Sequence, residues 1–118
     1  MLAHQIDTLE FLTDDEKLAV AEIKQGVQKL VGERLRGVYL FGSKARGDYD
    51  PESDVDLAIL VEGLDRKTKD NILDTVGNAE IRYVVVISSF VLSWKDFTDL
   101  RDRERRIAFD IEHEGIRL

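Results

Sequence analysis

The first regular pattern in the chain is an apolar stripe with helical spacing between residues 13 and 35. Its members fall at i, i+4, i+7 and i+8, on one face of an α-helix: Ile23, Val27, Leu30 and Val31. Thr13 and Glu16 have the spacing of a capping box, which predicts that the helix begins at Thr13. Residues 1–35 are therefore expected to form an N-terminal helical segment whose apolar face covers a sheet.

Three apolar stretches after this segment have the character of β-strands. Residues 38–41 are apolar on both faces, which predicts a central strand, and residues 54–61 alternate between two faces. Residues 81–88, IRYVVVIS, are rich in β-branched side chains and predict a third strand. Helical patterns occupy the segments between and after them: a single turn at SKARG, then residues 65–76, 94–100 and 101–112.

Helices that alternate with apolar strands predict an α/β (α+β) fold, with a mixed sheet of three to five strands flanked by helices. The chain has 118 residues and 43% hydrophobic content, enough for one compact core and too little for two ordinary domains. We therefore expect residues 1–118 to form a single domain.

Composition narrows the classes of partner. A formal net charge of −7 argues against extensive nucleic-acid binding, because affinity for phosphate backbones comes from clustered lysine and arginine. No stretch approaches the roughly 18 apolar residues of a membrane span, so no membrane contact is expected. The chain contains no cysteine, which excludes disulfides and thiolate metal sites and fits a cytoplasmic protein.

Two acidic residues stand at the start of the second predicted strand. Asp54 and Asp56 are i and i+2, so their side chains leave the same face, with Cα atoms roughly 6 to 7 Å apart. Their mutual repulsion costs about 2 to 3 kcal/mol at an effective dielectric near 20. A divalent cation reverses the sign of this term, and an all-oxygen site favours Mg²⁺ or Mn²⁺ over zinc.

A Gly-Ser pair ends the first predicted strand. Gly42 lacks a side chain and lets a ligand approach the backbone, and Ser43 offers a hydroxyl and an N–H where a helical turn begins. Arg46 lies one turn later and adds positive charge to the same place. Such a turn is typical of a phosphate site, although most Gly-Ser pairs are ordinary turns. Together with the acidic pair, it predicts a site for a metal-bound nucleotide.

These residues carry a resemblance to a known family. The run GSKARGDYDPESDVDL resembles the signature of the DNA polymerase β-like nucleotidyltransferase superfamily, and chain length and the ending IEHEGIRL are similar to its minimal nucleotidyltransferase (MNT) branch. The resemblance implies that Gly42 and Ser43 receive a triphosphate, with Arg46 and Ser53 beside it, and that Asp54 and Asp56 hold Mg²⁺. It also implies transfer of a nucleoside monophosphate, with AMP from ATP expected, to an acceptor hydroxyl.

Members of this family usually carry a third carboxylate on a neighbouring strand, which shares the metal and acts as a general base. In the predicted strand over residues 81–88, the simplest alignment puts Arg82 at that position, and arginine can neither bind a cation nor accept a proton. Glu80 has the same parity and replaces the missing acid if the strand begins earlier. Glu80 is therefore the third candidate catalytic residue, with a solvated turn residue as the alternative.

The resemblance implies a role as antitoxin paired with a HEPN-domain toxin, whose hydroxyl is the acceptor. One alternative is a nucleotide-binding antitoxin with impaired catalysis, which neutralises its partner by contact. A second is transfer to a small molecule, as in antibiotic nucleotidyltransferases, although those usually carry a further domain. The sequence leaves open whether the protein is a homo-oligomer.

Overall fold

A four-stranded sheet forms the centre of the molecule in the computed structural model, which describes residues 9–48 and 53–118. The strands are β1 (Leu35–Phe41), β2 (Val55–Val61), β3 (Ile87–Ser93) and β4 (Ile116–Arg117). Their order is β3-β2-β1-β4, and β1 is antiparallel to both neighbours whereas β2 and β3 are parallel. The predicted mixed sheet flanked by helices is confirmed, and β1 and β2 occupy its centre.

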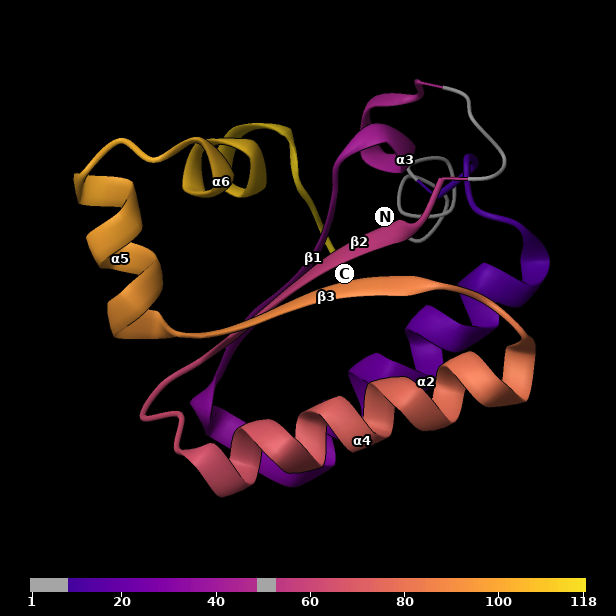
Figure 1. The fold of residues 1–118 in the computed structure, drawn as a ribbon, viewed down its shortest axis with the longest axis horizontal. Coiled ribbons are helices and arrows are strands. Elements are labelled where there is room, and N and C mark those ends of the chain that lie inside the picture. The colour runs from indigo at the N-terminus through magenta and orange to yellow at the C-terminus, as the bar shows by residue number, and fades with distance from the viewer. Residues whose placement is uncertain (1–8, 49–52) are drawn as a thin grey trace.

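Two long helices cover one face of the sheet and lie side by side (Figure 1). They are α2 (Asp14–Val31) and α4 (Arg66–Tyr83). The capping box that starts α2 is present, because Thr13 and Glu16 each accept the other's backbone N–H. The odd-numbered residues of β2 from Val55 to Val61 are buried against these helices, as their alternation predicts.

The C-terminal segment covers the opposite face. It comprises α5 (Trp94–Asp102), α6 (Arg106–Phe109) and a π-helix, η2 (Asp110–Glu114). Ala58 and Leu60, which point the other way along β2, pack there with Phe41, Phe97 and Ile111. Apolar cores on both faces explain why β2 is apolar at consecutive positions. Within the described residues, no helix combines the length and apolar character needed to cross a membrane.

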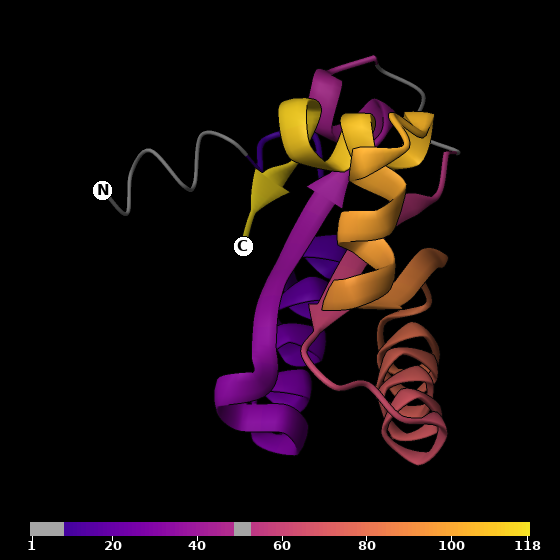
Figure 2. The same cartoon turned by 90° about the vertical axis from the view of Figure 1, so that its left-hand side faces the viewer.

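The short helix α3 (Ser43–Arg46) follows β1 directly, as the sequence predicts, and Gly47 ends it in the left-handed conformation. Figure 2 shows α3 and α6 at the same end of the sheet, with β4 beside β1. The residues that follow β1 therefore lie close to the C-terminal segment, and Arg46 contacts Glu114, which is 68 residues away in sequence.

Several boundaries differ from the prediction; β1, for example, begins at Leu35 instead of residue 38. α2 ends at Val31, where a 3-10 turn η1 (Gly32–Arg34) begins, and Leu30 is 41% exposed although its spacing predicted burial. The strand predicted at residues 81–88 is wrong: α4 continues to Tyr83, and β3 spans Ile87–Ser93. Packing of α4 against α2 outweighs the β-branched character of the segment.

Val84 caps the C-terminus of α4 in an uncommon conformation. Its φ is 55° and its ψ is 56°, in the left-handed region that favours glycine. A β-branched residue there is strained, at a cost of about 1 to 2 kcal/mol. Its N–H and that of Val85 bond to the carbonyl of Glu80, so the helix end is satisfied although its cap residue is unfavourable.

Candidate active site

Gly42 and Asp56 are in direct contact where β1 and β2 pair. Phe41 lies opposite Asp56 in the antiparallel ladder, so the residue that follows Phe41 faces the same carboxylate. A Cβ at Gly42 would collide with Oδ2 of Asp56. Gly42 also has φ 76° and ψ −158°, a combination that only glycine adopts readily. Glycine is required here both for the turn and to leave room for the carboxylate.

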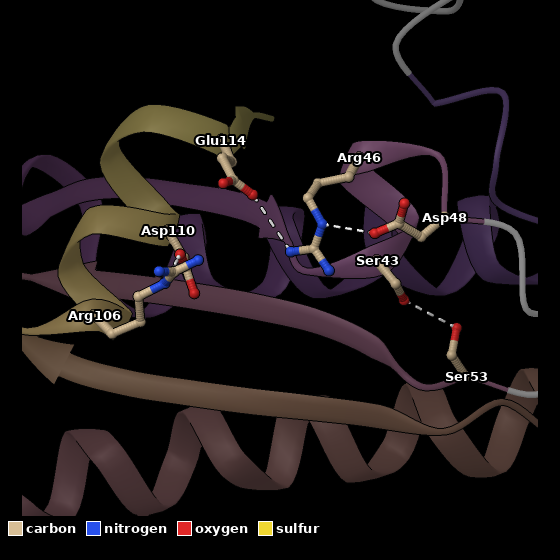
Figure 3. Close-up of polar contacts among 7 residues, drawn as sticks. All are labelled: Ser43, Arg46, Asp48, Ser53, Arg106, Asp110 and Glu114. Carbon is tan, nitrogen blue, oxygen red and sulfur yellow. Dashed lines mark hydrogen bonds and ion pairs between the residues drawn. The ribbon is translucent and has the colours of Figure 1, made fainter.

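Ser43 begins α3, and its hydroxyl donates to the Ser53 hydroxyl at an Oγ–Oγ distance of 3.2 Å (Figure 3). This bond joins the turn after β1 to the segment that precedes β2. The predicted pair of serines is therefore brought together beside Asp54 and Asp56. The loop residues 49–52, which include the single proline of the sequence, Pro51, lie outside the described residues.

The pKa of the Asp56 carboxyl is shifted by burial and by neighbouring side chains. Burial raises the pKa of its carboxyl above the ordinary value, and the negative charge of Asp54 raises it further. A hydrogen bond from Ser88 and the positive charge of Arg46 lower the pKa and offset part of that increase. The two carboxylates thus repel each other in the protein alone, as their i and i+2 spacing predicts.

Arg46 is held by two carboxylates from different parts of the chain. Its Nε donates to Asp48 Oδ2 at 2.8 Å, and its Nη1 donates to Glu114 Oε2 at 3.3 Å (Figure 3). The hydrogen bond to Asp48 is the main reason why the pKa of Arg46 is raised. Glu114 belongs to η2, so the C-terminal segment reaches the candidate site, which no local signal in the sequence indicates.

The third predicted acid is not on the strand where its catalytic role was expected. Glu80 lies on α4, and its Oε2 accepts the backbone N–H of Ile87 at 3.0 Å. Arg82 also lies on α4 and pairs with Glu22 at 3.0 Å, so the alignment that put it at the third position was wrong. The β3 residue beside Asp56 is Ser88. With the strand placed correctly, the alternation of its side chains would have identified Ser88 as the neighbour of Asp56.

The donor set of this site suits a hard cation. Asp54 and Asp56 supply carboxylate oxygens, the nearby hydroxyls are also oxygen donors, and the two carboxylates repel without a positive charge between them. Among residues 9–48 and 53–118, no cluster of three or more acidic, histidine or cysteine side chains could enclose a metal. One or two carboxylates completed by substrate phosphates are the usual Mg²⁺ arrangement, so the residues present fit that ion.

A buried ion pair joins the helical turn after β1 to the start of α2. Lys44 Nζ donates to Glu16 Oε2 at 2.6 Å, and their side chains are only 5% and 10% exposed. The other oxygen of Glu16 accepts the Thr13 N–H in the capping box. One carboxylate therefore fixes both the start of α2 and the helical turn that begins at Ser43. The sequence predicts the capping box at Glu16 but carries no local signal for the contact between Glu16 and Lys44.

Comparison with known proteins identifies the family of the chain. Residues 20–114 match the nucleotidyltransferase domain family. Two proteins of Methanocaldococcus jannaschii are similar, both named "Putative protein adenylyltransferase". MJ0141 is 38% identical over 61% of this chain and 74% of its own length, and MJ0604 is 34% identical over 67% and 75%.

A solved structure, described as that of a "putative nucleotidyltransferase" from Sulfolobus solfataricus, aligns with 98% of this chain and 83% of its own, at 23% identity and a TM-score of 0.49. The family match spans β1, α3, β2 and β3, and so includes Gly42, Ser43, Asp54, Asp56 and Ser88, whereas Glu16 lies before it. The chain belongs to the nucleotidyltransferase family, in its minimal nucleotidyltransferase branch, and is a nucleotidyltransferase enzyme.

Proposed function

We propose that the chain transfers AMP from ATP, bound with Mg²⁺ or Mn²⁺, to a hydroxyl on a partner protein. The observation that carries this proposal is the packing of the Asp56 carboxylate against the Gly42–Ser43 turn, which joins an acidic pair to a phosphate-type turn. The names of the two relatives, which specify protein adenylylation, support the choice of nucleotide and of a protein acceptor.

In the proposed reaction the acceptor oxygen bonds to the α-phosphorus, the bond to the pyrophosphate oxygen breaks, and the hydroxyl proton leaves to solvent. Gly42 gives the triphosphate access to the backbone, Ser43 and Ser53 donate to its oxygens, and Arg46 offsets its charge. Asp54 and Asp56 would hold the cation. When bound, the cation neutralises charge on the phosphates and lowers the barrier to attack.

Ser88 favours a second candidate, the antitoxin that binds nucleotide but neutralises its partner by contact. A serine beside Asp56 donates a hydrogen bond and cannot supply a third carboxylate. Glu80 as general base remains an expectation from the sequence, and its bond to Ile87 supports a structural role instead. The transfer reaction proposed above requires only two carboxylates and solvent. The serine beside Asp56 therefore does not exclude it, and we prefer this candidate.

The wider assignments are also proposals. A partner from the HEPN family, an antitoxin role and a cytoplasmic location are proposed from the resemblance and composition. A single domain over residues 1–118 is proposed from chain length, and the arrangement of one sheet with helices on both faces supports it.

The test is transfer of label from each α-labelled nucleoside triphosphate, with Mg²⁺ and a lysate of the source cells. We expect a labelled protein band with ATP that disappears with Asp54→Asn. Asp70→Asn, a matched change at an exposed position on α4, should label as the wild type does. Absence of label from a wild-type protein that still binds Mg²⁺-ATP would favour the contact-only antitoxin.

A further inference from the structure

The turn from α4 to β3 exposes a group of apolar side chains. Ile81 is 80% exposed, Val84 is 90% exposed and Val86 is 59% exposed. All three lie within the six residues 81–86, which form the end of α4 and the turn that follows it. Scattered exposed apolar residues need no explanation, but a contiguous group indicates an interaction surface. We call Ile81, Val84 and Val86 the valine-turn surface.

The conformation of Val84 is a second, independent observation. The residues with positive φ in the described chain are mostly glycines, and the two that are not are Val84 and the polar Glu104. At Val84 both the backbone conformation and the exposure are unfavourable for a β-branched apolar side chain. Asparagine or glycine would suit the helix end better. Strained residues of this kind are concentrated at functional sites, where binding requires them.

Part of this surface adjoins Asp54. Val84 and Val86, together with Asp15, Ser53 and Asp54, line a hollow of about 250 Å³. The N–H of Val55 donates to the Val86 carbonyl at 3.1 Å, which ties the turn to the start of β2 between Asp54 and Asp56. A molecule seated on the turn would therefore have its neighbouring groups close to the proposed site of transfer.

The charge around the hollow is negative. Asp15 and Asp54 are both exposed, and the whole chain carries a net charge of −7. The nearest cation along this segment is Arg82, and Glu22 already pairs with it. Lys44 is buried against Glu16. Charge complementarity thus favours an occupant that brings basic side chains next to its apolar ones.

We propose that the valine-turn surface docks the acceptor protein, through a segment that combines apolar and basic side chains and carries its hydroxyl toward Asp54. This inference rests on the proposed function and adds to it the chemistry of the acceptor. Val84 acts in docking and takes no part in nucleotide binding. The apolar residues anchor the segment, and the acidic rim selects its charge.

The experiment measures binding of short fluorescent peptides that share a central tyrosine and differ in their flanks: leucine with lysine, leucine with glutamate, or serine with lysine. We expect the leucine-lysine peptide to bind the wild type most tightly, and Val84→Asn to weaken that binding about tenfold. Ile81→Asn provides a second variant. Leu30→Asn, at an exposed position at the far end of α2, is the matched control and should bind as the wild type does.

Equal affinity for the three peptides, absence of binding, or no effect of Val84→Asn would overturn the proposal. A dimer of the wild type that Val84→Asn converts to monomer would also overturn it, in favour of a second copy of the chain. Binding of Mg²⁺-ATP and transfer of label are measured separately on the same variants. Loss of transfer with intact peptide binding would contradict the proposed function and leave the docking surface in place.

Discussion

At the scale of single residues, Asp56 is costly to keep ionised in the metal-free protein. Its pKa is raised in the folded state by burial and by Asp54. The unfolded chain therefore ionises more readily, and the contribution of Asp56 to stability is lost as pH rises from the ordinary value through the raised one. The same charge binds the cation when the proposed metal site is occupied. A residue that lowers stability but is needed for binding is typical of functional sites.

Asp56→Asn removes that ionisation. In the presence of a chelator at pH 7, we expect a thermal midpoint about 2 °C higher than the wild type, a modest effect because the carboxylate is only part-buried. The difference should vanish below about pH 4, where the wild-type carboxyl is protonated as well. Thermal unfolding across this pH range measures both, with Asp70→Asn as the control.

Addition of Mg²⁺ provides the complementary measurement. The midpoint of the wild type should rise with the cation, and that of Asp56→Asn should stay nearly constant. A lower midpoint for Asp56→Asn at pH 7 without metal would mean that the carboxylate stabilises the fold, and that its role is structural.

The sequence predicts these residues well where the signal is local. Gly42, Ser43, Ser53, Asp54 and Asp56 lie in one short run, and the structure brings them to one end of the sheet. Glu80 was expected on a strand only if the strand predicted at residues 81–88 began earlier, yet it lies on α4. Ser88 was missed for the same reason, since the face of a strand residue depends on where the strand begins.

At the scale of elements, the ion pair between Glu16 and Lys44 joins α2 to the turn after β1. Lys44→Met should lower the free energy of unfolding by about 3 kcal/mol, because it leaves the Glu16 carboxylate buried without its partner. Denaturant unfolding measures this loss. Glu62→Gln breaks the exposed pair with Arg36 and should cost less than about 1 kcal/mol, which makes it the matched control.

A double variant separates the cost of an unpaired buried charge from the cost of lost side-chain packing. Glu16→Gln combined with Lys44→Met keeps an acceptor for the Thr13 N–H and removes both charges, so we expect much of the stability to return. If the double variant is as unstable as Lys44→Met alone, the loss comes from packing of the lysine stem. The ion pair then contributes little to the position of Ser43.

The boundary between α4 and β3 shows why elements are harder to place than motifs. Val84, Val85 and Val86 favour a strand by local propensity, and the chain indeed becomes extended shortly after them. The helix persists to Tyr83 because its buried positions, among them Ile72, Val76 and Ala79, pack against the sheet and α2. Tertiary contact decides the boundary, and a single sequence does not reveal it.

At the scale of the whole molecule, the helices on the two faces of the sheet bury separate cores and carry different residues to the site. α2 and α4 bury one core, and their ends near the site carry Asp15 and the valine-turn surface. α5, α6 and η2 bury the other core, and η2 brings Glu114 to Arg46. The alternation along β2 predicts both cores. The contact between Arg46 and Glu114 depends on how the C-terminal segment returns across the sheet, which has no local sequence signal.

That contact leads to a prediction about the nucleotide. If Arg46 binds the triphosphate, the Glu114 carboxylate competes with the phosphates for the Arg46 guanidinium. The negative charge of Glu114 also repels the phosphates. Glu114→Gln keeps a hydrogen-bond acceptor and removes the charge, so we expect Mg²⁺-ATP to bind about threefold more tightly at low salt, with less gain at high salt. Arg46→Gln should weaken binding about tenfold. Fluorescence titration with a labelled ATP analogue measures both.

Glu112→Gln is the control for Glu114→Gln, because Glu112 lies on the same π-helix and pairs with Arg101 instead of Arg46. Its affinity for Mg²⁺-ATP should match the wild type. Weaker binding by Glu114→Gln alone would mean that the carboxylate positions Arg46 for the phosphates and does not compete with them. In that case the C-terminal segment would be part of the nucleotide site, and its return across the sheet would be a requirement for binding.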